Sequence, residues 1–430
     1  MPELVAVNSN PVVTVDTDVS GLEDRYTAEF ESYSGKSFIR KSKADIQAEL
    51  KQIEAQTGIK SAIVYANFAS SGDTSKIDED VLYLVIFTSE GKTIRRVVSY
   101  ATRARVKKVA DELYNEMRLE NVNSTKYLKS AQQLYKWLIA PHEAELKKQG
   151  INNLSFVLDN GLRFIPLAAL HDGNQFLIEK YSLGIIPSVS TTNMSYSNIK
   201  NAQVLAMGAS EFAKEQNKEP LPAVPVELYN IAKLWNGKSF LNQSFTLENL
   251  KTQRQKNPVP NKPFEMIHLA THVDFAPGDA SSSYIQLYNS KLRLDQVSEL
   301  GWNQPPVELL VLSACESAFG DKDAELGFAG LAIKTGVKSA VASLWYVSDA
   351  GTLGLMTEFY RQLKTSSIKS EALRQAQLAM IQGKIKVEEN QLTGVRGNID
   401  IPLEIATKLQ DANLSHPYYW SAFTMIGSQW

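Results

Sequence analysis

Cysteine, histidine and long apolar runs are all scarce in this 430-residue chain, and each scarcity excludes a class of protein. The single cysteine, Cys315, excludes an internal disulfide framework and favours a reducing compartment, which we expect to be the cytoplasm. No apolar run approaches the roughly 20 residues that span a bilayer. The first residues also lack the basic and apolar regions of a signal peptide. We therefore expect no membrane as a partner.

An excess of charge of one sign is also missing. The chain has 45 Lys and Arg against 47 Asp and Glu, so a nucleic acid or an anionic membrane is not an expected partner. The sequence contains no P-loop and no glycine-rich phosphate fingerprint between a strand and a helix. It also contains no cluster of His, Cys and acidic residues at zinc-binding spacing. We therefore expect neither a cofactor nor a metal.

Two short apolar runs end at the residue types that carry chemistry. Residues 309–312 (LLVL) are typical of a strand buried on both faces of a parallel sheet, and Cys315 follows where that strand is expected to end. Residues 264–271 (FEMIHLAT) form a second such run, which ends at His272. Ligands bind beyond the carboxyl ends of strands in open α/β sheets, so neighbouring parallel strands would place the imidazole beside the thiol. A thiol needs such a base to become a nucleophile at neutral pH.

Strand and helix patterns alternate in two series along the chain. We divide it into a disordered leader with a helical N-terminal segment (1–55), a first α/β lobe (56–198) and a second α/β lobe (199–430). The second lobe carries both Cys315 and His272. Repeated alternation predicts right-handed βαβ units and mostly parallel sheets, so the fold class is α/β. Residues 388–412, which are polar and contain Gly and Pro, are expected to form a loop insertion.

Further short motifs accompany the two strand ends in a fixed order. They are residues 268–272 (HLATH), 312–316 (LSACE), Gly327, 330–332 (GLA), 343–345 (SLW), Asp349, 359–360 (FY), 372–373 (AL) and 416–420 (HPYYW), with Leu162, Pro166 and Leu170 ahead of them. In this set the chain resembles the CHAT-domain cysteine peptidases, bacterial relatives of caspases and separase. The resemblance covers roughly residues 125–430. One motif alone is weak evidence, whereas this many in family order is strong.

The resemblance implies a caspase-like three-layer α/β/α fold in which an inactive pseudo-caspase lobe precedes the active lobe. It implies a cysteine endopeptidase with Cys315 as nucleophile and His272, not His268, as base; caspases also place their His about 50 residues before their Cys. By the same resemblance, the backbone N–H groups of Val273 and Cys315 bind the oxyanion. The substrate would be a protein or peptide. Many members look cyanobacterial and carry partner modules, so a regulatory protein partner is also expected.

One residue departs from the family pattern. The family usually has glycine directly after the catalytic histidine, and here it is Val273, whose β-branch restricts the backbone and crowds the site. Two interpretations therefore stay open, a cysteine endopeptidase and a catalytically inactive pseudopeptidase that serves as a protein-interaction module. For Cys315 itself the alternative is a buried core residue, because free cysteine is among the most buried residue types. The three histidines outside these motif strands, His142, His171 and His416, are expected to be structural.

The segment after the next strand, residues 343–349, lines the substrate pocket by resemblance. Ser343 and Trp345 are expected to present backbone and aromatic surface to the substrate. Asp349 is expected to cap the following helix; in a second reading, either Asp349 or Asp274 gives the pocket a negative end. The second reading predicts Arg or Lys at P1 in preference to an acidic residue, because a guanidinium pairs bidentately with a carboxylate.

Overall fold

The computed structural model describes residues 18–69, 74–121, 123–257, 262–277, 281–317, 321–394, 397–409 and 412–430, without the side chains at 74–75 and 314–317. Its first half contains α1 (Val19–Ser34), α2 (Lys43–Thr57), β1 (Ser61–Ala69), β2 (Val81–Thr88), β3 (Thr93–Thr102), α3 (Arg103–Met117), α4 (Tyr127–Leu138), α5 (Glu143–Lys148), β4 (Asn153–Leu158), α6 (Leu177–Lys180) and β5 (Ser182–Ile185). The disordered leader was expected to reach to about residue 22; residues 1–17 lie outside the described part of the chain, and α1 already begins at Val19.

The second half continues the alternation. It contains β6 (Val204–Gly208), α7 (Val224–Leu234), β7 (Lys238–Leu241), α8 (Leu247–Arg254), β8 (Met266–Phe275), β9 (Tyr284–Gln286), β10 (Lys291–Arg293), β11 (Leu309–Ser317), α9 (Lys322–Ala329), α10 (Leu331–Thr335), β12 (Ser339–Ser343), α11 (Asp349–Leu363), α12 (Lys369–Ile381), α14 (Pro417–Trp420) and β16 (Phe423–Gly427). Most of these elements were predicted by hydrophobic periodicity. The short β5, which lies in the middle of the sheet, was not.

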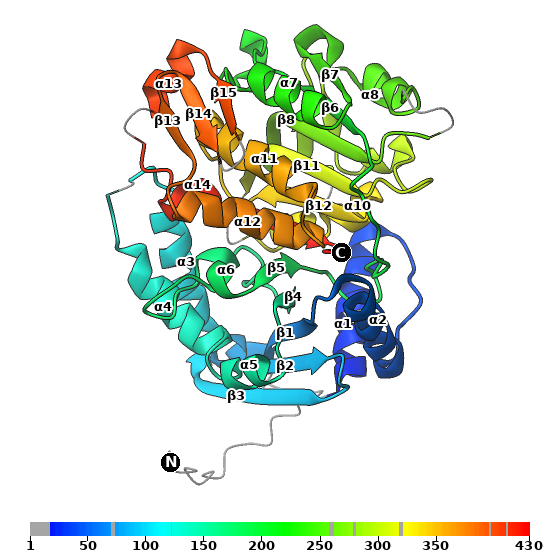
Figure 1. Ribbon diagram of the computed structural model, residues 1–430. Coiled ribbons are helices and arrows are strands. Elements are labelled where there is room, and N and C mark those ends of the chain that lie inside the picture. Colours follow the sequence, from blue (N-terminus) through cyan, green and yellow to red (C-terminus); the bar gives the residue numbers. More distant parts are fainter. Residues whose placement is uncertain are drawn as a thin grey trace, which may run out of the picture.

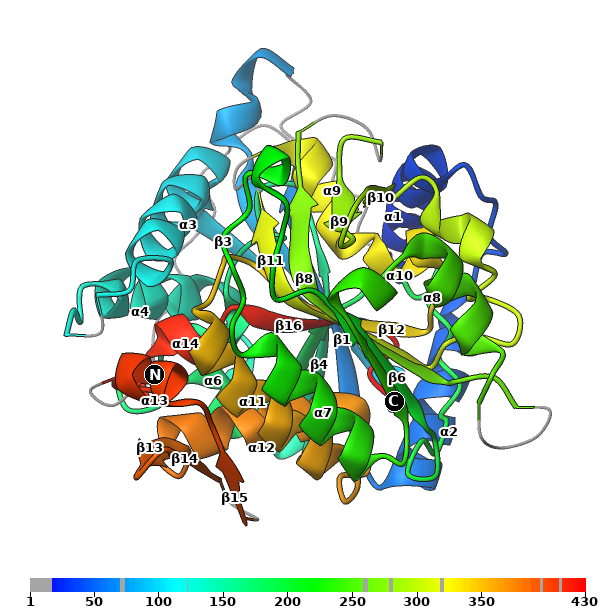
Figure 2. The ribbon, with the colours of Figure 1, turned by 90° about the horizontal axis from the view of Figure 1, so that it is seen from above.

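The strands named above form one sheet, with the order β10-β9-β8-β11-β12-β16-β5-β4-β1-β2-β3. In addition, β6 pairs with β8, and β7 pairs with β6. Most neighbouring pairs are parallel. Helices α7, α11 and α12 cover one face of the second half, and α8 and α10 lie on the other (Figures 1 and 2). This arrangement is the predicted α/β/α fold with a mostly parallel sheet.

Strand β1 shows how the sequence builds a sheet with two covered faces. All nine of its residues are buried. Ile63 and Tyr65 belong to the apolar cluster beneath α1 and α2, whereas Ala62 and Val64 belong to the main core on the opposite face. A strand with two apolar faces cannot show the alternation of a half-exposed strand, so it reads as a continuous apolar run.

The two halves are joined through the C-terminal strand. β16 pairs antiparallel with β12 of the second half and parallel with β5 of the first, and the C-terminus lies near the middle of the molecule (Figure 1). The Gln429 amide group donates to Ser155 Oγ at 2.7 Å and accepts from Asn153 at 2.7 Å. The sheet is therefore continuous across the expected lobe boundary.

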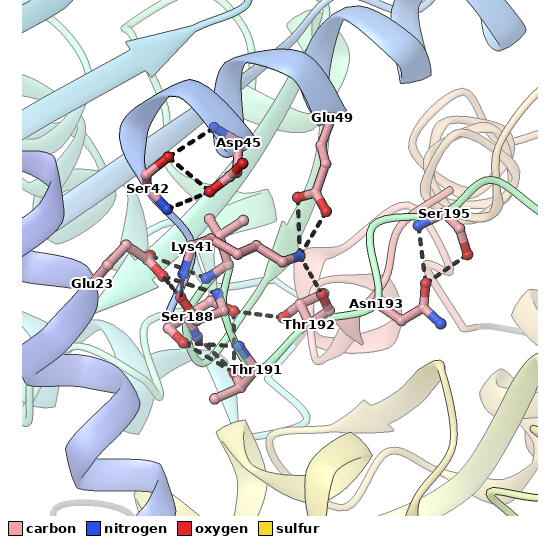
Figure 3. Close-up of polar contacts among 12 residues, drawn as sticks. Glu23, Lys41, Ser42, Asp45, Glu49, Ser188, Thr191, Thr192, Asn193 and Ser195 are labelled. Atoms are coloured by element: carbon pink, nitrogen blue, oxygen red, sulfur yellow. Dashed lines mark hydrogen bonds and ion pairs between the residues drawn. The ribbon is translucent and has the colours of Figure 1, made fainter. Parts of the chain in front are cut away.

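Helix α1 also holds the segment that connects the two halves. Its Glu23 carboxylate is fully buried and accepts hydrogen bonds from the backbone N–H groups of Val189 and Ser190 and from Tyr65 Oη. Lys41, just ahead of α2, reaches the Thr192 carbonyl oxygen at 3.1 Å (Figure 3). The buried charge is stabilised by these donors, which fix the connecting segment against the N-terminal helices.

The expectation of a loop insertion at residues 388–412 is wrong. This region forms a second, three-stranded antiparallel sheet of β13 (Lys386–Glu388), β14 (Gln391–Gly394) and β15 (Gly397–Asp400), followed by α13 (Leu403–Leu409). Glu389 and Asn390 both adopt positive φ, which gives the two-residue hairpin turn between β13 and β14. The strands are too short for a periodic apolar pattern to reveal them.

Candidate active site

His272 and Cys315 lie on neighbouring parallel strands, β8 and β11. In their register Ala314 is opposite His272 and Cys315 is opposite Val273. The predicted adjacency of the two strands is thus confirmed. The predicted strand ends are wrong, because β8 runs on to Phe275 and β11 to Ser317. The Cys315 side chain lies outside the described residues, so its place is known from the backbone register.

The register is irregular just before the two residues. Between the pairs Leu312–Leu269 and Ala314–His272, β8 contains one residue more than β11. Such a bulge bends the strand and re-aims the side chains that follow it. Beyond it His272 and Asp274 are half-buried, whereas Val273 and Phe275 are buried in the core. His272 and Asp274 therefore share one face of the strand, and Val273 projects to the other.

The site lies where the sheet changes direction. From β6 the chain proceeds to β7 on one side and then to β8 on the other, and both pair parallel with β6. Open α/β sheets bind ligands at such a switch point, outside the carboxyl ends of the strands. β6 pairs with β8 only as far as Ala270, and β9 pairs with it from Val273 onward. His272 thus stands at the opening between these two partners.

The segment after β6, residues 209–223, covers His272, and we name it the covering loop. The Glu219 carbonyl oxygen lies 2.8 Å from His272 Nε2, and the Phe212 ring centroid lies 5.0 Å from the imidazole. The base of the loop is closed by a 3.0 Å hydrogen bond from the Leu221 N–H to the Ser210 carbonyl. Neither Phe212 nor Glu219 was predicted, because a loop without periodicity gives no signal of where it packs.

The Glu219 contact determines the tautomer of His272. A carbonyl oxygen only accepts hydrogen bonds, so Nε2 of His272 must carry the proton that is donated to Glu219. In the neutral imidazole, Nδ1 is then the nitrogen that accepts a proton. A backbone carbonyl thus fixes both the orientation and the tautomer of the histidine, as hydrogen-bond partners do for metal-binding histidines.

His268 is buried, as expected from its place within the strand. Its side chain is fully covered, its Nδ1 lies 3.2 Å from Tyr360 Oη, and its Nε2 lies 2.8 Å from Glu227 Oε1. The two atoms of this last contact are close, but their geometry is not that of a hydrogen bond. His268 therefore belongs to a buried polar cluster beneath the site, with Glu227 of α7 and Tyr360 of α11.

The two residues expected to line the substrate pocket after β12, Ser343 and Trp345, are both buried. Trp345 is only 3% exposed, and its indole N–H donates to the Tyr418 carbonyl oxygen at 3.2 Å. Ser343 is fully buried. The exposed aromatic side chain is Tyr346, 37% exposed, whose ring stacks on His272 at 6.0 Å with an interplanar angle of 23°. The apolar pattern of residues 339–345 could not tell the last strand residue from the first exposed one.

The two candidate acidic residues have different surroundings. Asp274 is half-buried on the same strand face as His272. Asp349 does not cap its own helix, because Ser348 is the N-cap of α11 and accepts from the Gly351 N–H at 3.3 Å. The Asp349 carboxylate instead accepts a short hydrogen bond from the Ala223 N–H at the start of α7. Burial raises the pKa of Asp349 to about 7.

Another acidic residue lies close to the site in sequence, is buried, and was not predicted. Glu325 of α9, the helix after the cysteine strand, is 2% exposed and accepts a 2.8 Å hydrogen bond from the Gly161 N–H of the first half. Burial raises its pKa to about 7, although Gly161 and Arg163 act in the opposite direction. Glu325 therefore ties α9 to the turn after β4.

Two of the three remaining histidines accept hydrogen bonds from nearby backbone N–H groups, and the third is buried. His171 Nδ1 accepts from the Gly173 N–H at 2.9 Å, and His416 caps α14 by accepting from the Tyr418 N–H at 3.2 Å. His142 is 1% exposed, and burial lowers its pKa to about 3. Within the described ranges no group of three His, Cys, Asp or Glu side chains is placed to hold a metal ion. None of the helices described there is long and apolar enough to cross a membrane.

Solved structures with a similar fold include the separase–securin complex of Saccharomyces cerevisiae. One structure of this complex matches with a TM-score of 0.50 and 9% identity, covering 90% of this chain and 31% of the separase chain. The complex of the pro- and mature domains of RgpB from Porphyromonas gingivalis matches with a TM-score of 0.39 and 12% identity, covering 75% and 76%. The chain thus spans about a third of the separase chain that it matches. The first match shows a caspase-like fold.

No curated protein matches the sequence. The sequence model of the CHAT domain matches residues 128–428, which is more than half of the chain. Its span includes β8, β11 and the covering loop. The chain therefore belongs to the CHAT domain family, whose fold is that of caspase-like cysteine proteases.

Proposed function

We propose that this chain is a cysteine endopeptidase with Cys315 as nucleophile and His272 as general base. The observation that carries the proposal is the pairing of β8 and β11 at the switch point of the sheet. This pairing brings the backbone of the only cysteine beside that of a half-buried histidine whose Nε2 is engaged by a carbonyl oxygen. Thiol and imidazole together suffice for acyl transfer.

The proposed reaction uses the tautomer that Glu219 imposes. Nδ1 of His272 accepts the thiol proton, and the Cys315 thiolate attacks the scissile carbonyl carbon. The imidazolium then protonates the leaving amine as the peptide C–N bond breaks. Water, deprotonated by the same imidazole, hydrolyses the thioester and regenerates the thiol. The imidazolium stays hydrogen-bonded to the Glu219 carbonyl, which stabilises its charge.

The oxyanion would be bound by the backbone N–H groups of Val273 and Cys315. The buried side chain of Val273 supports this role. Because Val273 and His272 project to opposite faces of β8, the β-branch packs in the core and does not occupy the cleft. The replacement of glycine by valine therefore leaves space for a substrate carbonyl beside His272.

The pocket for the P1 side chain would lie between Tyr346 and Asp274. Tyr346 offers an exposed ring next to His272, and Asp274 offers a carboxylate on the same strand face. We predict that substrates with Arg at P1 are cleaved faster than those with Asp or Leu, because the guanidinium would pair with this carboxylate. Fluorogenic peptides that differ only at P1 measure this preference. Asp274→Asn should reduce it, and equal rates for Asp and Arg would contradict the pocket.

The runner-up is a catalytically inactive interaction module, the alternative that the replacement of the usual glycine by Val273 left open in the sequence. The solved separase structure contains securin as a bound protein. By analogy we propose that a regulatory protein partner covers the cleft of this chain. Such a partner is compatible with both functions, so it does not separate them.

A set of peptidyl electrophiles, varied only at P1, separates the two functions. The peptidase predicts covalent labelling of wild-type Cys315 by at least one reagent and none after Cys315→Ala. His272→Ala should slow labelling by about 100-fold or more, because general-base catalysis typically contributes that much. His171→Ala, in the first half, is the matched control and should label like the wild type. Failure of every reagent with the wild type favours the interaction module.

A further inference from the structure

Asp349 links α11 to α7, two of the helices that cover one face of the sheet. It is the first residue of α11, but Ser348 caps that helix. Its carboxylate accepts from the N–H of Ala223, which is the N-cap residue of α7. Alanine has no side-chain acceptor of its own at this position. Asp349 therefore supplies from another helix the acceptor that the start of α7 lacks.

Ala223 is also the last residue of the covering loop, four positions after Glu219. The loop has further anchors, because the Leu221 N–H donates to Ser210 at its base and the Gln216 amide donates to the Tyr288 carbonyl oxygen at 3.0 Å. Of the three anchors, Asp349 is the one with a carboxyl group, and it holds the loop at Ala223, the end nearest Glu219. Asp349 holds Ala223, the backbone of residues 220–222 joins Ala223 to Glu219, and the Glu219 carbonyl contacts His272.

The charges around Asp349 oppose one another. The positive end of the α7 dipole favours its ionised form, and so does Lys408 of α13. Burial and Glu227, one turn into α7, favour the protonated form. The phenol of Tyr346, in the segment ahead of α11, is also close enough to sense the charge of Asp349. The pKa of Asp349 is about 7, so both its ionised and its neutral form are accessible near neutral pH. The ionised form holds the Ala223 N–H more strongly, because a charged acceptor makes a stronger hydrogen bond.

We propose that Asp349 is a positioning residue: it anchors the covering loop so that the Glu219 carbonyl holds His272 as the Nε2–H tautomer. Asp349 would touch neither the substrate nor the thiol. Its consequence for peptide cleavage rests on the proposed function, whereas its effect on the histidine tautomer does not. The role differs from the substrate pocket that the sequence predicted for this aspartate.

The side-chain ¹⁵N spectrum of histidine-labelled full-length protein tests the proposal without turnover. The chain has five histidines, and His272→Ala identifies the signal of His272. We expect the Nε2–H tautomer in the wild type at pH 8. Asp349→Ala should give an averaged mixture of both tautomers. Asp349→Asn keeps the shape and a neutral acceptor, so its spectrum should lie between those of the wild type and Asp349→Ala. The other four histidine signals should not move.

Gln216→Ala is the matched control, because it removes an uncharged anchor of the same loop. It should leave the tautomer unchanged and the pH dependence of the His272 signal as in the wild type. In a labelling assay Asp349→Ala should react about 10- to 100-fold more slowly than the wild type, as expected for a misplaced catalytic group.

An unchanged Nε2–H signal in Asp349→Ala overturns the proposal. If Asp349→Ala does not fold, all five histidine signals will change, and the Asp349→Asn variant then tests the proposal. A His272 signal like that of the wild type in Asp349→Asn would also overturn it. If wild-type Cys315 resists every electrophile while the tautomer still depends on Asp349, the proposed function fails and the positioning role stands.

Discussion

Individual residues around the proposed site divide into those that are exposed beside His272 and those that support the sheet. Trp345 and Tyr346 are the clearest pair, since they are adjacent in sequence and differ tenfold in exposure, 3% against 37%. The indole of Trp345 packs edge-on against Tyr114 at 5.7 Å, whereas the phenol of Tyr346 stacks on His272. Single replacements should therefore separate stability from activity.

Trp345→Ala is expected to lower the free energy of unfolding by about 3–5 kcal/mol, because it opens a cavity in the core. Tyr346→Ala should change that free energy by less than about 1 kcal/mol, as is usual for partly exposed side chains. It should instead reduce cleavage and the rate of Cys315 labelling. Urea denaturation and the labelling assay measure the two effects. A large loss of stability in Tyr346→Ala would contradict the assignment of Tyr346 to the cleft.

At the scale of elements, helices α9 and α11 are anchored to distant parts of the chain by carboxyl groups. Asp349 links α11 to α7, and Glu325 links α9 to the turn after β4. In both cases burial raises the pKa to about 7. Contacts between these elements are therefore sensitive to pH in a range where ordinary carboxylates are not.

Glu325 makes a definite contribution to the pH dependence of stability. Its pKa in the folded chain is about 7, above the ordinary value of 4.5, so the folded state binds its proton more tightly than the unfolded state. The stabilisation is fully present below pH 4.5 and is lost as the pH rises through 7. Glu325→Gln should therefore lose less stability than the wild type between pH 5 and about 8.

Urea denaturation at the two pH values measures this difference. Asp349 titrates with the same sign, so the comparison must be between Glu325→Gln and the wild type and not between pH values alone. Glu404→Gln, on the exposed part of α13, serves as the control and should follow the wild type. A loss in Glu325→Gln as large as that in the wild type would show that Glu325 is not the titrating group.

At the scale of the whole molecule, the continuous sheet couples the two halves. β16 lies between β12 and β5, and Trp430 after it donates from its indole to Ser61 Oγ of β1 at 3.2 Å. Breaking this strand would expose the core edges of both halves at once. We therefore expect the described halves to unfold together, although the sequence was divided at residue 198.

Thermal or urea unfolding should show a single transition, with coincident midpoints for circular dichroism and tryptophan fluorescence. Gly427→Ala should lower the midpoint of both probes equally. Gly427 has φ of 82°, and an added Cβ would lie 2.6 Å from the Lys338 carbonyl oxygen, so alanine is strained there. Two separated transitions, or a shift confined to one probe, would instead support two independent lobes.

The sequence by itself determined the class of fold and the strands that carry the site. Apolar runs such as 309–312 mark buried strands because burial on both faces demands apolar residues at every position. Helix ends also carry local signals, as Gly58 does at the end of α2. These signals are readable because the interacting groups lie within a few residues of one another.

Only the tertiary structure decided how the site is supported. The extra residue in β8 opposite β11, the covering loop over His272 and the hydrogen bond from Ala223 to Asp349 join segments far apart in the chain, in the last case by 126 residues. Such contacts satisfy backbone groups at helix ends and loop tips, where many sequences fit equally well and no period is imposed. The sequence could therefore indicate the proposed nucleophile and base, but not the groups that orient them.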